Sequence, residues 1–258
     1  MLTIAAVVLL GYLGLCALVF AFQRSMIYLP QPRSSGSGLS TIALPIDGGQ
    51  VLVSARSHPG PNAVLYFGGN AEDVSYSFPS LLAAFPDHAI YLMHYRGYGG
   101  SAGSPSEAAL FADALALFDR ARAEHQQIVA VGRSLGSGIA VHLASVRPVA
   151  RLVLVTPYDS LLDLAAQQFP YLPVRWLLRD KYESWRYAGR VTAPTLLVAA
   201  EHDEVIPRAS TQALYGRFSA GIASLKVVPG AGHNTLSDRA EYVSLLGAAP
   251  LGEEAPPL

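Results

Sequence analysis

A serine, an aspartate and a histidine stand in an order and a setting that could support nucleophilic catalysis. The sequence GRSLG at 132–136 places Ser134 directly after the apolar run 128–131 and directly before the apolar helical segment 135–146. A strand, a sharp turn and a helix in this succession project a serine hydroxyl from the end of a parallel sheet, and the glycines prevent clashes in the turn. Ser134 is therefore the predicted nucleophile.

A second G-x-S-x-G match is centred on Ser101. It lies six residues beyond the strand-like run 89–95, in a glycine-rich loop that precedes Pro105. The motif is short, and a chain with 23 glycines can match it by chance. The strand–turn–helix setting therefore favours Ser134 over Ser101.

His233 is the predicted general base. A serine hydroxyl is a poor nucleophile unless a base takes its proton and a third group orients that base. His233 follows the strand-like run 225–228, in the chain order serine, acid, histidine that is typical of this motif. A capping or core histidine is the structural alternative. The other histidines are in less suitable places: His58, His88, His94 and His125 precede the serine, His142 lies on the helix after it, and His202 lies in a loop.

Asp203 is the predicted acid that orients the histidine. It follows the apolar run 195–200 within the sequence EHDEVIP, where the chain enters the next predicted helix. Its rivals are Asp159, which comes after the preceding strand-like run, and the neighbours Glu201 and Glu204. An N-cap aspartate is the structural alternative, because such side chains commonly accept hydrogen bonds at the start of a helix.

Two backbone N–H groups could stabilise the oxyanion of an acyl-transfer reaction. One is that of Leu135, the residue after the nucleophile, and the other belongs to the loop GGNA at 68–71, after the run 63–67. Within this loop the Asn70 N–H is the predicted donor, and Ala71 is the next candidate. The loop lacks the lysine of a phosphate-binding P-loop, and no G-x-G-x-x-G opens a helix elsewhere.

Short apolar runs alternate with longer amphipathic segments along the chain. The predicted strands are 51–55, 63–67, 89–95, 128–131, 152–156, 195–200 and 225–228, and the predicted helices are 71–84, 106–125, 135–146, 207–218 and 236–246. This alternation predicts an α/β fold with a mostly parallel sheet of about eight strands and helices on both faces. Functional residues of such a sheet gather at the carboxyl ends of its strands, where the candidates above all lie.

The N-terminal segment is long and apolar enough for one transmembrane helix. Residues 2–22 carry no charge and would span roughly 31 Å as a helix, about the thickness of the hydrocarbon core. A cleaved signal peptide and a buried helix are the alternatives, but a signal peptide would have a basic n-region and a small-residue cleavage site. Arg24 and Arg33 follow the span, so the positive-inside rule leans towards a cytoplasmic domain, and the side of the membrane stays open.

The chain divides into an anchor at 1–23, a Ser/Gly/Pro-rich linker at 24–40, a folded domain at 41–247 and a flexible tail at 248–258. An aromatic-rich insertion at 159–190 is expected to form a short cap, either as an apolar substrate pocket or as ordinary packing.

Composition narrows the classes of function. The net charge of −1 argues against a nucleic-acid partner, and the single cysteine excludes a disulfide framework and a cysteine-based metal site. The hydrophobic fraction of 51% falls to about 48% without residues 1–22, an ordinary value for a soluble domain. Sixteen arginines against two lysines, with abundant alanine, suggest a GC-rich bacterial genome and hence an inner-membrane location.

The chain from about residue 24 to 246 resembles an α/β-hydrolase, specifically the membrane-anchored α/β-hydrolase-domain proteins and their serine-aminopeptidase-like bacterial relatives. The resemblance rests on the sequences GGNA at 68–71, YRGYGGSAGSPSE at 95–107, GRSLG at 132–136, EHDEVIP at 201–207 and GAGHN at 230–234. The resemblance implies Ser134, Asp203 and His233 as a catalytic triad, in agreement with the placement above. One departure is visible: the family usually has His-Gly-Asn-Ala where this chain has Gly68-Gly-Asn-Ala.

These observations predict a membrane-anchored serine hydrolase that acts on an ester, thioester or amide bond of a small or acylated substrate, with no metal or cofactor. An aminopeptidase-like activity and a non-catalytic binding or scaffold role are the alternatives. Arg96 and Arg133 belong to the family motifs. They could form ion pairs, through Asp73 or Asp113, or contact an anionic substrate group.

Overall fold

The computed structural model describes residues 2–34 and 38–248, and it contains one eight-stranded sheet in the order β1-β2-β4-β3-β5-β6-β7-β8. The strands are β1 (Ser40–Ile46), β2 (Gly49–Arg56), β3 (Asn62–Phe67), β4 (Ala89–Met93), β5 (Gln127–Arg133), β6 (Arg151–Val155), β7 (Thr195–Ala200) and β8 (Ala223–Val228). Strands β3 to β8 pair in parallel, whereas β2 pairs antiparallel with both β1 and β4. The predicted α/β class is confirmed.

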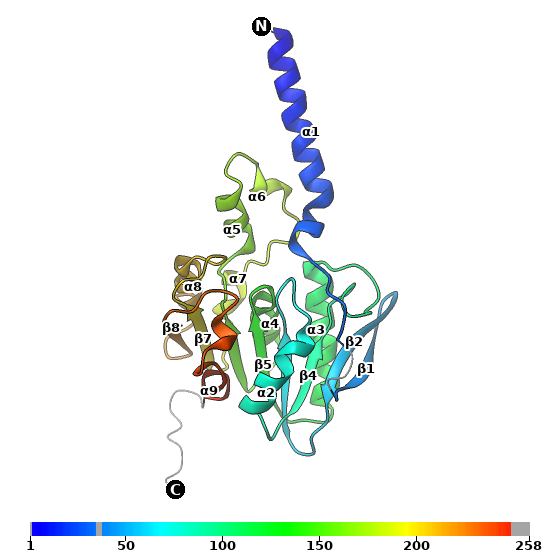
Figure 1. Ribbon diagram of the computed structural model, residues 1–258, viewed down its shortest axis with the longest axis vertical. Helices are drawn as coiled ribbons and strands as arrows, with labels where there is room; N and C mark the ends of the chain where they lie inside the picture. The colour runs from blue at the N-terminus through cyan, green and yellow to red at the C-terminus, as the bar shows by residue number, and fades with distance from the viewer. Residues whose placement is uncertain (1, 35–37, 249–258) are drawn as a thin grey trace.

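Helices cover both faces of the sheet (Figure 1). Alternate residues of β3 show the two cores: Leu65 and Phe67 pack into one apolar cluster, and Val64 and Tyr66 into the other. The first cluster contains residues of α3 (Glu107–Arg122), α4 (Leu135–Val146), α7 (Trp185–Ala188) and α8 (Arg208–Tyr215), and the second contains residues of α2 (Phe78–Ala84) and α9 (Tyr242–Gly247). Strands buried on both faces explain why the predicted strands are nearly continuous apolar runs.

Three elements differ from the sequence-based expectation. The predicted helix at 71–84 is α-helical only over α2, and a 3₁₀ turn at Val74–Ser77 precedes it. β1 is absent from the predicted strands because it contains Pro45 and only Leu44 is buried, a pattern that an exposed edge strand tolerates. The predicted helix at 236–246 is interrupted: a 3₁₀ turn at Leu236–Asp238 precedes α9. The expected tail at 248–258 lies, after residue 248, outside the described residues, as does part of the expected linker.

Helix α1 (Leu2–Ile27) projects away from the rest of the molecule (Figure 1). It continues five residues beyond the uncharged stretch that the sequence defines, so its last turns reach the folded domain. Residues 3–27 are long and apolar enough to cross a membrane, and little of this segment is buried.

The insertion between β6 and β7 lies at the same end of the sheet as α1 (Figure 1). It forms α5 (Leu161–Gln168), α6 (Val174–Leu177) and α7. Tyr171 and Trp176 of this cap are almost fully exposed, whereas Tyr182 is fully buried and part of the main core. The cap is thus packed at its base and apolar on its surface.

Candidate active site

Ser134 lies in the tight turn between β5 and α4, with φ of 50° and ψ of −118°. Positive φ is unfavourable for a residue with a side chain and persists only where the surroundings impose it. The two motif glycines allow this turn: a Cβ on Gly132 would overlap the Gly136 carbonyl oxygen, and one on Gly136 would overlap that of Phe67. Close contact of β3, β5 and α4 therefore depends on glycine at both positions.

The three residues predicted for the triad are joined by hydrogen bonds. Nε2 of His233 lies 3.1 Å from Oγ of Ser134, and its Nδ1 lies 3.0 and 2.9 Å from the two carboxylate oxygens of Asp203. A carboxylate only accepts hydrogen bonds, so Nδ1 donates and Nε2 faces the serine with its lone pair. The side chains of His233 and Asp203 are 7% and 5% exposed, so water competes little with their contact.

Neighbouring backbone groups hold the acid and the base in place. Oδ1 of Asp203 accepts the N–H groups of Val205 (2.9 Å) and Ile206 (2.7 Å). A carboxylate oxygen of Glu204 accepts the N–H of His233 at 3.1 Å, and this bond is the main cause of the lowered pKa of Glu204. Asp203 thus also stabilises its own loop. It is not the N-cap of the following helix, because Pro207 occupies that position of α8.

The rival residues have other partners. Glu201 accepts the N–H of Gly230, and Asp159 pairs with Arg217 at 3.4 Å. Ser101 is buried, and its hydroxyl donates to the carbonyl of His94 and accepts the N–H of Leu52, both at 2.8 Å. Ser101 is therefore a structural residue that links a loop to β2.

The residues predicted to supply the oxyanion donors lie close to Ser134. Asn70, Leu135 and Ser134 line the same cavity, and a Cβ on Gly69 would lie 3.8 Å from that of Ser134. Among the hydrogen bonds of the described residues, neither the Asn70 N–H nor the Leu135 N–H has an acceptor. Both are thus available to a substrate oxygen.

Gly68 stands where the family usually has a histidine. Its absence fits the local packing, because a Cβ at Gly68 would lie 2.6 Å from Val74.

Glu72 connects the oxyanion loop to the nucleophile turn, and the sequence-based reasoning did not find it. One carboxylate oxygen accepts the Gly69 N–H at 2.7 Å and pairs with Arg133 at 3.2 Å. The other accepts the hydroxyls of Tyr66 (2.7 Å) and Ser77 (2.6 Å). Burial, followed by the charge of Glu72, raises the pKa of Tyr66 well above its usual range, so the phenol remains a donor.

The two motif arginines form ion pairs. Arg96 binds Asp113 through two contacts of 2.8 and 2.7 Å, and Asp113 is one of the two partners predicted for these arginines. Arg133 pairs with Glu72, which was not among those expected. Asp73 instead accepts hydrogen bonds from Ser34. These ion pairs explain the positions of both arginines without a contact to a substrate.

A cavity of about 660 Å³ opens at Ser134. Its wall is mostly apolar and comes from two parts of the chain distant in sequence. The cap contributes Leu161, Leu164, Ala165, Phe169, Leu172, Val174, Leu177 and Leu178, and α1 contributes Val19, Gln23, Met26 and Ile27. The aromatic-rich insertion in the sequence predicted a contribution from the cap, but no sequence signal placed the end of α1 beside Ser134.

No group of three or more metal-ligating side chains occurs within residues 2–34 and 38–248.

The strand order, the nucleophile turn and the loop sequence together define a class of protein. A family profile described as alpha/beta hydrolase fold matches residues 62–184, and one described as serine aminopeptidase, S33, matches residues 174–240. This chain belongs to the α/β-hydrolase family.

Its relatives occur in bacteria and animals. An uncharacterized protein of Mycobacterium tuberculosis is 35% identical over 90% of this chain and 88% of its own length. The alpha/beta hydrolase domain-containing proteins aho-3 of Caenorhabditis elegans and 17C of Xenopus tropicalis are 34% and 33% identical over 73% and 74% of this chain. This chain spans 58% and 62% of those two proteins.

Solved structures share the fold at low sequence identity. The Pyrococcus furiosus esterase Pf2001 has a TM-score of 0.66 at 16% identity and covers 85% of this chain and 95% of its own. The thioesterase domain from the curacin biosynthetic pathway has a TM-score of 0.60 at 18% identity, over 81% of this chain and 99% of its own.

Proposed function

We propose that this protein is a serine hydrolase that cleaves an ester, thioester or amide bond through an acyl-enzyme. The observation that carries the proposal is the continuous contact from Asp203 through His233 to Ser134 at the mouth of an apolar cavity. The esterase and thioesterase among the structural neighbours are consistent with it.

The reaction starts with attack of the Ser134 hydroxyl on the substrate carbonyl while Nε2 of His233 takes the proton. Asp203 holds the imidazole in the required orientation and stabilises its charged form. The N–H groups of Asn70 and Leu135 donate hydrogen bonds to the carbonyl oxygen and so stabilise the negative charge that develops on it. His233 then gives its proton to the leaving alcohol, thiol or amine, and it later activates the water that hydrolyses the acyl-enzyme.

The proposed location is the membrane, with residues 1–23 as a single-pass anchor and 41–247 as the catalytic domain. The length, hydropathy and exposure of α1 support this. Exposed Trp176 and Tyr171 on the neighbouring cap support it further, since tryptophan and tyrosine are enriched at the membrane interface. A bacterial inner membrane remains the proposed setting, and neither side of it is assigned.

The cavity favours an acyl group over a charged one, because apolar side chains make up most of its wall. Amide hydrolysis is the second candidate, since the serine-aminopeptidase profile matches residues 174–240. Turnover measurements separate acyl hydrolysis from amide hydrolysis. The substrates are p-nitrophenyl esters and acyl thioesters of increasing chain length, with aminoacyl arylamides for comparison. We expect turnover of the acyl substrates to exceed that of the arylamides.

The variants Ser134→Ala and Ser101→Ala of the full chain test the nucleophile. We expect Ser134→Ala to lose turnover by a factor of about 10⁶, the order seen when a triad serine is removed. Ser101→Ala serves as the matched control, since it also removes a hydroxyl from a G-x-S-x-G sequence, and should retain turnover in the folded fraction. Loss of activity in Ser101→Ala alone would contradict the assignment. Lack of turnover by the unmodified protein on every substrate would favour the non-catalytic role.

A further inference from the structure

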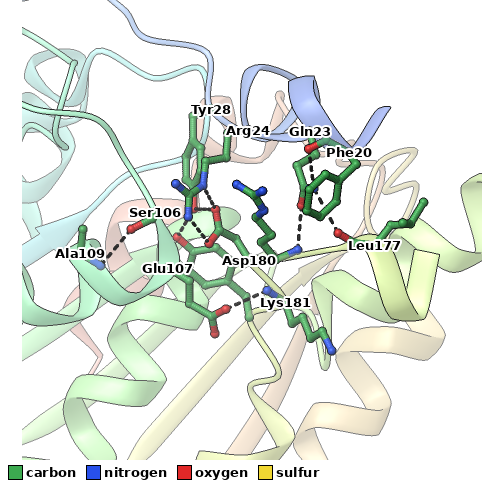
Figure 2. A network of polar contacts seen from close by, with 12 residues as sticks. Phe20, Gln23, Arg24, Tyr28, Ser106, Glu107, Ala109, Leu177, Asp180 and Lys181 are labelled. Atoms are coloured by element: carbon green, nitrogen blue, oxygen red, sulfur yellow. Dashed lines mark hydrogen bonds and ion pairs between the residues drawn. The ribbon is translucent and has the colours of Figure 1, made fainter. Parts of the chain in front are cut away.

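The last turns of α1 are attached to the cap by specific polar contacts (Figure 2). Gln23 is 5% exposed although it follows the apolar span. Its amide Nε2 donates to the carbonyl of Leu177 at 3.1 Å, and its Oε1 accepts the N–H of Arg179 at 2.7 Å. A buried amide that is hydrogen-bonded on both sides fixes the rotation of the helix relative to the cap.

An ion pair between a half-exposed arginine and a buried carboxylate extends this contact to the helix end (Figure 2). Arg24 binds the Asp180 carboxylate through Nε at 2.9 Å and Nη2 at 3.3 Å, and the Asp180 side chain is 5% exposed. The Tyr28 hydroxyl donates to Asp180 at 3.2 Å and lies 2.8 Å from that of Tyr182. A buried carboxylate is costly without partners, so these contacts require α1 in its observed place.

The end of α1 and the residues directly after it also contact the oxyanion loop. The Asn70 side chain donates from Nδ2 to the carbonyl of Ile27 at 3.1 Å, and its backbone carbonyl accepts the N–H of Leu29 at 3.1 Å. The Tyr98 hydroxyl completes the arrangement, since it accepts the Leu29 N–H at 2.8 Å and donates to the Asn70 carbonyl at 2.6 Å. Burial raises the pKa of Tyr98 to about 12, so the hydroxyl retains its proton.

We propose that residues 23–29 are a working part of the active site: they position the oxyanion loop through Asn70 and Tyr98, and with Val19 they form one wall of the substrate cavity. The proposal rests on the proposed function. Tyr98 is then a positioning residue, because it acts on the oxyanion loop through Asn70. Arg24 acts less directly, because its pair with Asp180 holds the end of α1 against the cap. An anchor that only tethered the domain would need none of these contacts.

The size of the expected effect follows from the chemistry of the site. One oxyanion donor contributes about 10²–10³ in rate, and a misplacement of about 1 Å can cost roughly 10². Loss of one bridging hydroxyl should displace the Asn70 N–H only partly. We therefore expect a decrease in kcat of about tenfold for Tyr98→Phe, with KM changed less than twofold.

The test uses the full-length protein in detergent micelles, with Tyr98→Phe and the control Tyr91→Phe. Both tyrosines are buried and each variant removes one hydroxyl, which makes two hydrogen bonds in Tyr98 and one in Tyr91. The partner of Tyr91 is His125, which bonds the Gly60 carbonyl and no residue of the oxyanion loop. An alkyl trifluoromethyl ketone, which forms a hemiketal oxyanion with the serine, reports on the hole itself. We expect its Ki to rise about tenfold in Tyr98→Phe, in parallel with the loss of kcat, and to stay unchanged in Tyr91→Phe.

Wild-type kcat and Ki in folded Tyr98→Phe would overturn the proposal. Should Tyr98→Phe fail to fold, Asp180→Asn gives a second measurement, because it weakens the pair with Arg24 and keeps the side-chain shape. We expect a lower kcat and a higher Ki there too, and wild-type values would again overturn the proposal. Lack of turnover by the unmodified protein would instead overturn the proposed function, and this inference with it.

Discussion

At the scale of single residues, Glu72 links the oxyanion loop to the turn that carries the proposed nucleophile. Its carboxylate bonds the oxyanion loop at Gly69 and pairs with Arg133, the residue directly before the nucleophile. The two strands that carry these segments, β3 and β5, are neighbours in the sheet. One side chain therefore couples the position of the oxyanion donors to that of Ser134.

The variant Glu72→Gln tests this coupling. It keeps the size of the side chain but removes the charge that pairs with Arg133 and weakens the bond to Gly69. We expect kcat to fall about tenfold with little change in KM, because Glu72 is not among the residues that line the cavity at Ser134. Steady-state kinetics with a neutral acyl ester measures both. A rise in KM confined to anionic substrates would favour the other role considered for Arg133, a contact with the substrate.

The residue scale is also where the sequence was most informative. The proposed nucleophile, base and acid each follow a recognisable apolar strand, so their loops could be assigned to one edge of the sheet. Glu72 follows no such rule. Its role depends on Tyr66, Ser77 and Arg133 meeting it in space, which no spacing in the sequence indicates.

At the scale of elements, the contact between β3, β5 and α4 decides whether the nucleophile turn can form. Gly136 lies on the first turn of α4, where any Cβ would overlap the Phe67 carbonyl at the end of β3. Buried strands and capped helices could be predicted because each has a local pattern. β1 could not, since an edge strand with a proline lacks one, and the attachment of α1 to the cap depends on tertiary contacts alone.

The variant Gly136→Ala measures how strict that contact is. The added methyl group forces β3 and α4 apart, so we expect a loss of stability of about 3 kcal/mol or more and loss of activity. Gly189→Ala is the matched control, because its Cβ would have its nearest neighbour at 3.5 Å, an ordinary contact. Urea unfolding of both variants gives the comparison. Equal stability of the two would contradict the packing described for the turn.

At the scale of the whole molecule, buried histidines should make stability depend on pH. His94 is 2% exposed, bonds Ser54 at 2.8 Å, and burial lowers its pKa to about 4. The unfolded chain binds a proton near pH 6.5, whereas the folded chain does so only near pH 4. The unfolded state therefore gains protons first as the pH falls, and stability is lost between about pH 6.5 and 4.

We expect His94 to contribute about 2 kcal/mol to the difference in stability between pH 7.5 and pH 5.0, because pH 5.0 lies about 1.5 pH units below the pKa of the unfolded chain. The free energy of unfolding in urea at pH 5.0 and pH 7.5 measures it. His94→Gln, which can retain the bond to Ser54, should show a smaller difference between the two pH values. The same pH dependence in both proteins would contradict this role of His94.

The cap and α1 lie at the same end of the molecule, which predicts a second point of contact with the bilayer. Trp176 is 89% exposed on the cap, and Trp185 is 40% exposed nearer its base. In liposomes, brominated lipid should quench the emission of a variant that retains only Trp176 more strongly than that of a variant that retains only Trp185. Phenylalanine replaces the other tryptophan in each. Equal or reversed quenching would contradict this orientation of the cap.

The most direct measurement of the central claim is the mass of the full-length protein after reaction with a fluorophosphonate, followed by peptide mapping. The account predicts one adduct per chain, on Ser134, no adduct in Ser134→Ala, and labelling of Asp203→Asn slowed by a factor of about 10⁴, as in known triads that lose the aspartate. An adduct on Ser101, or no adduct on the unmodified protein, would contradict it.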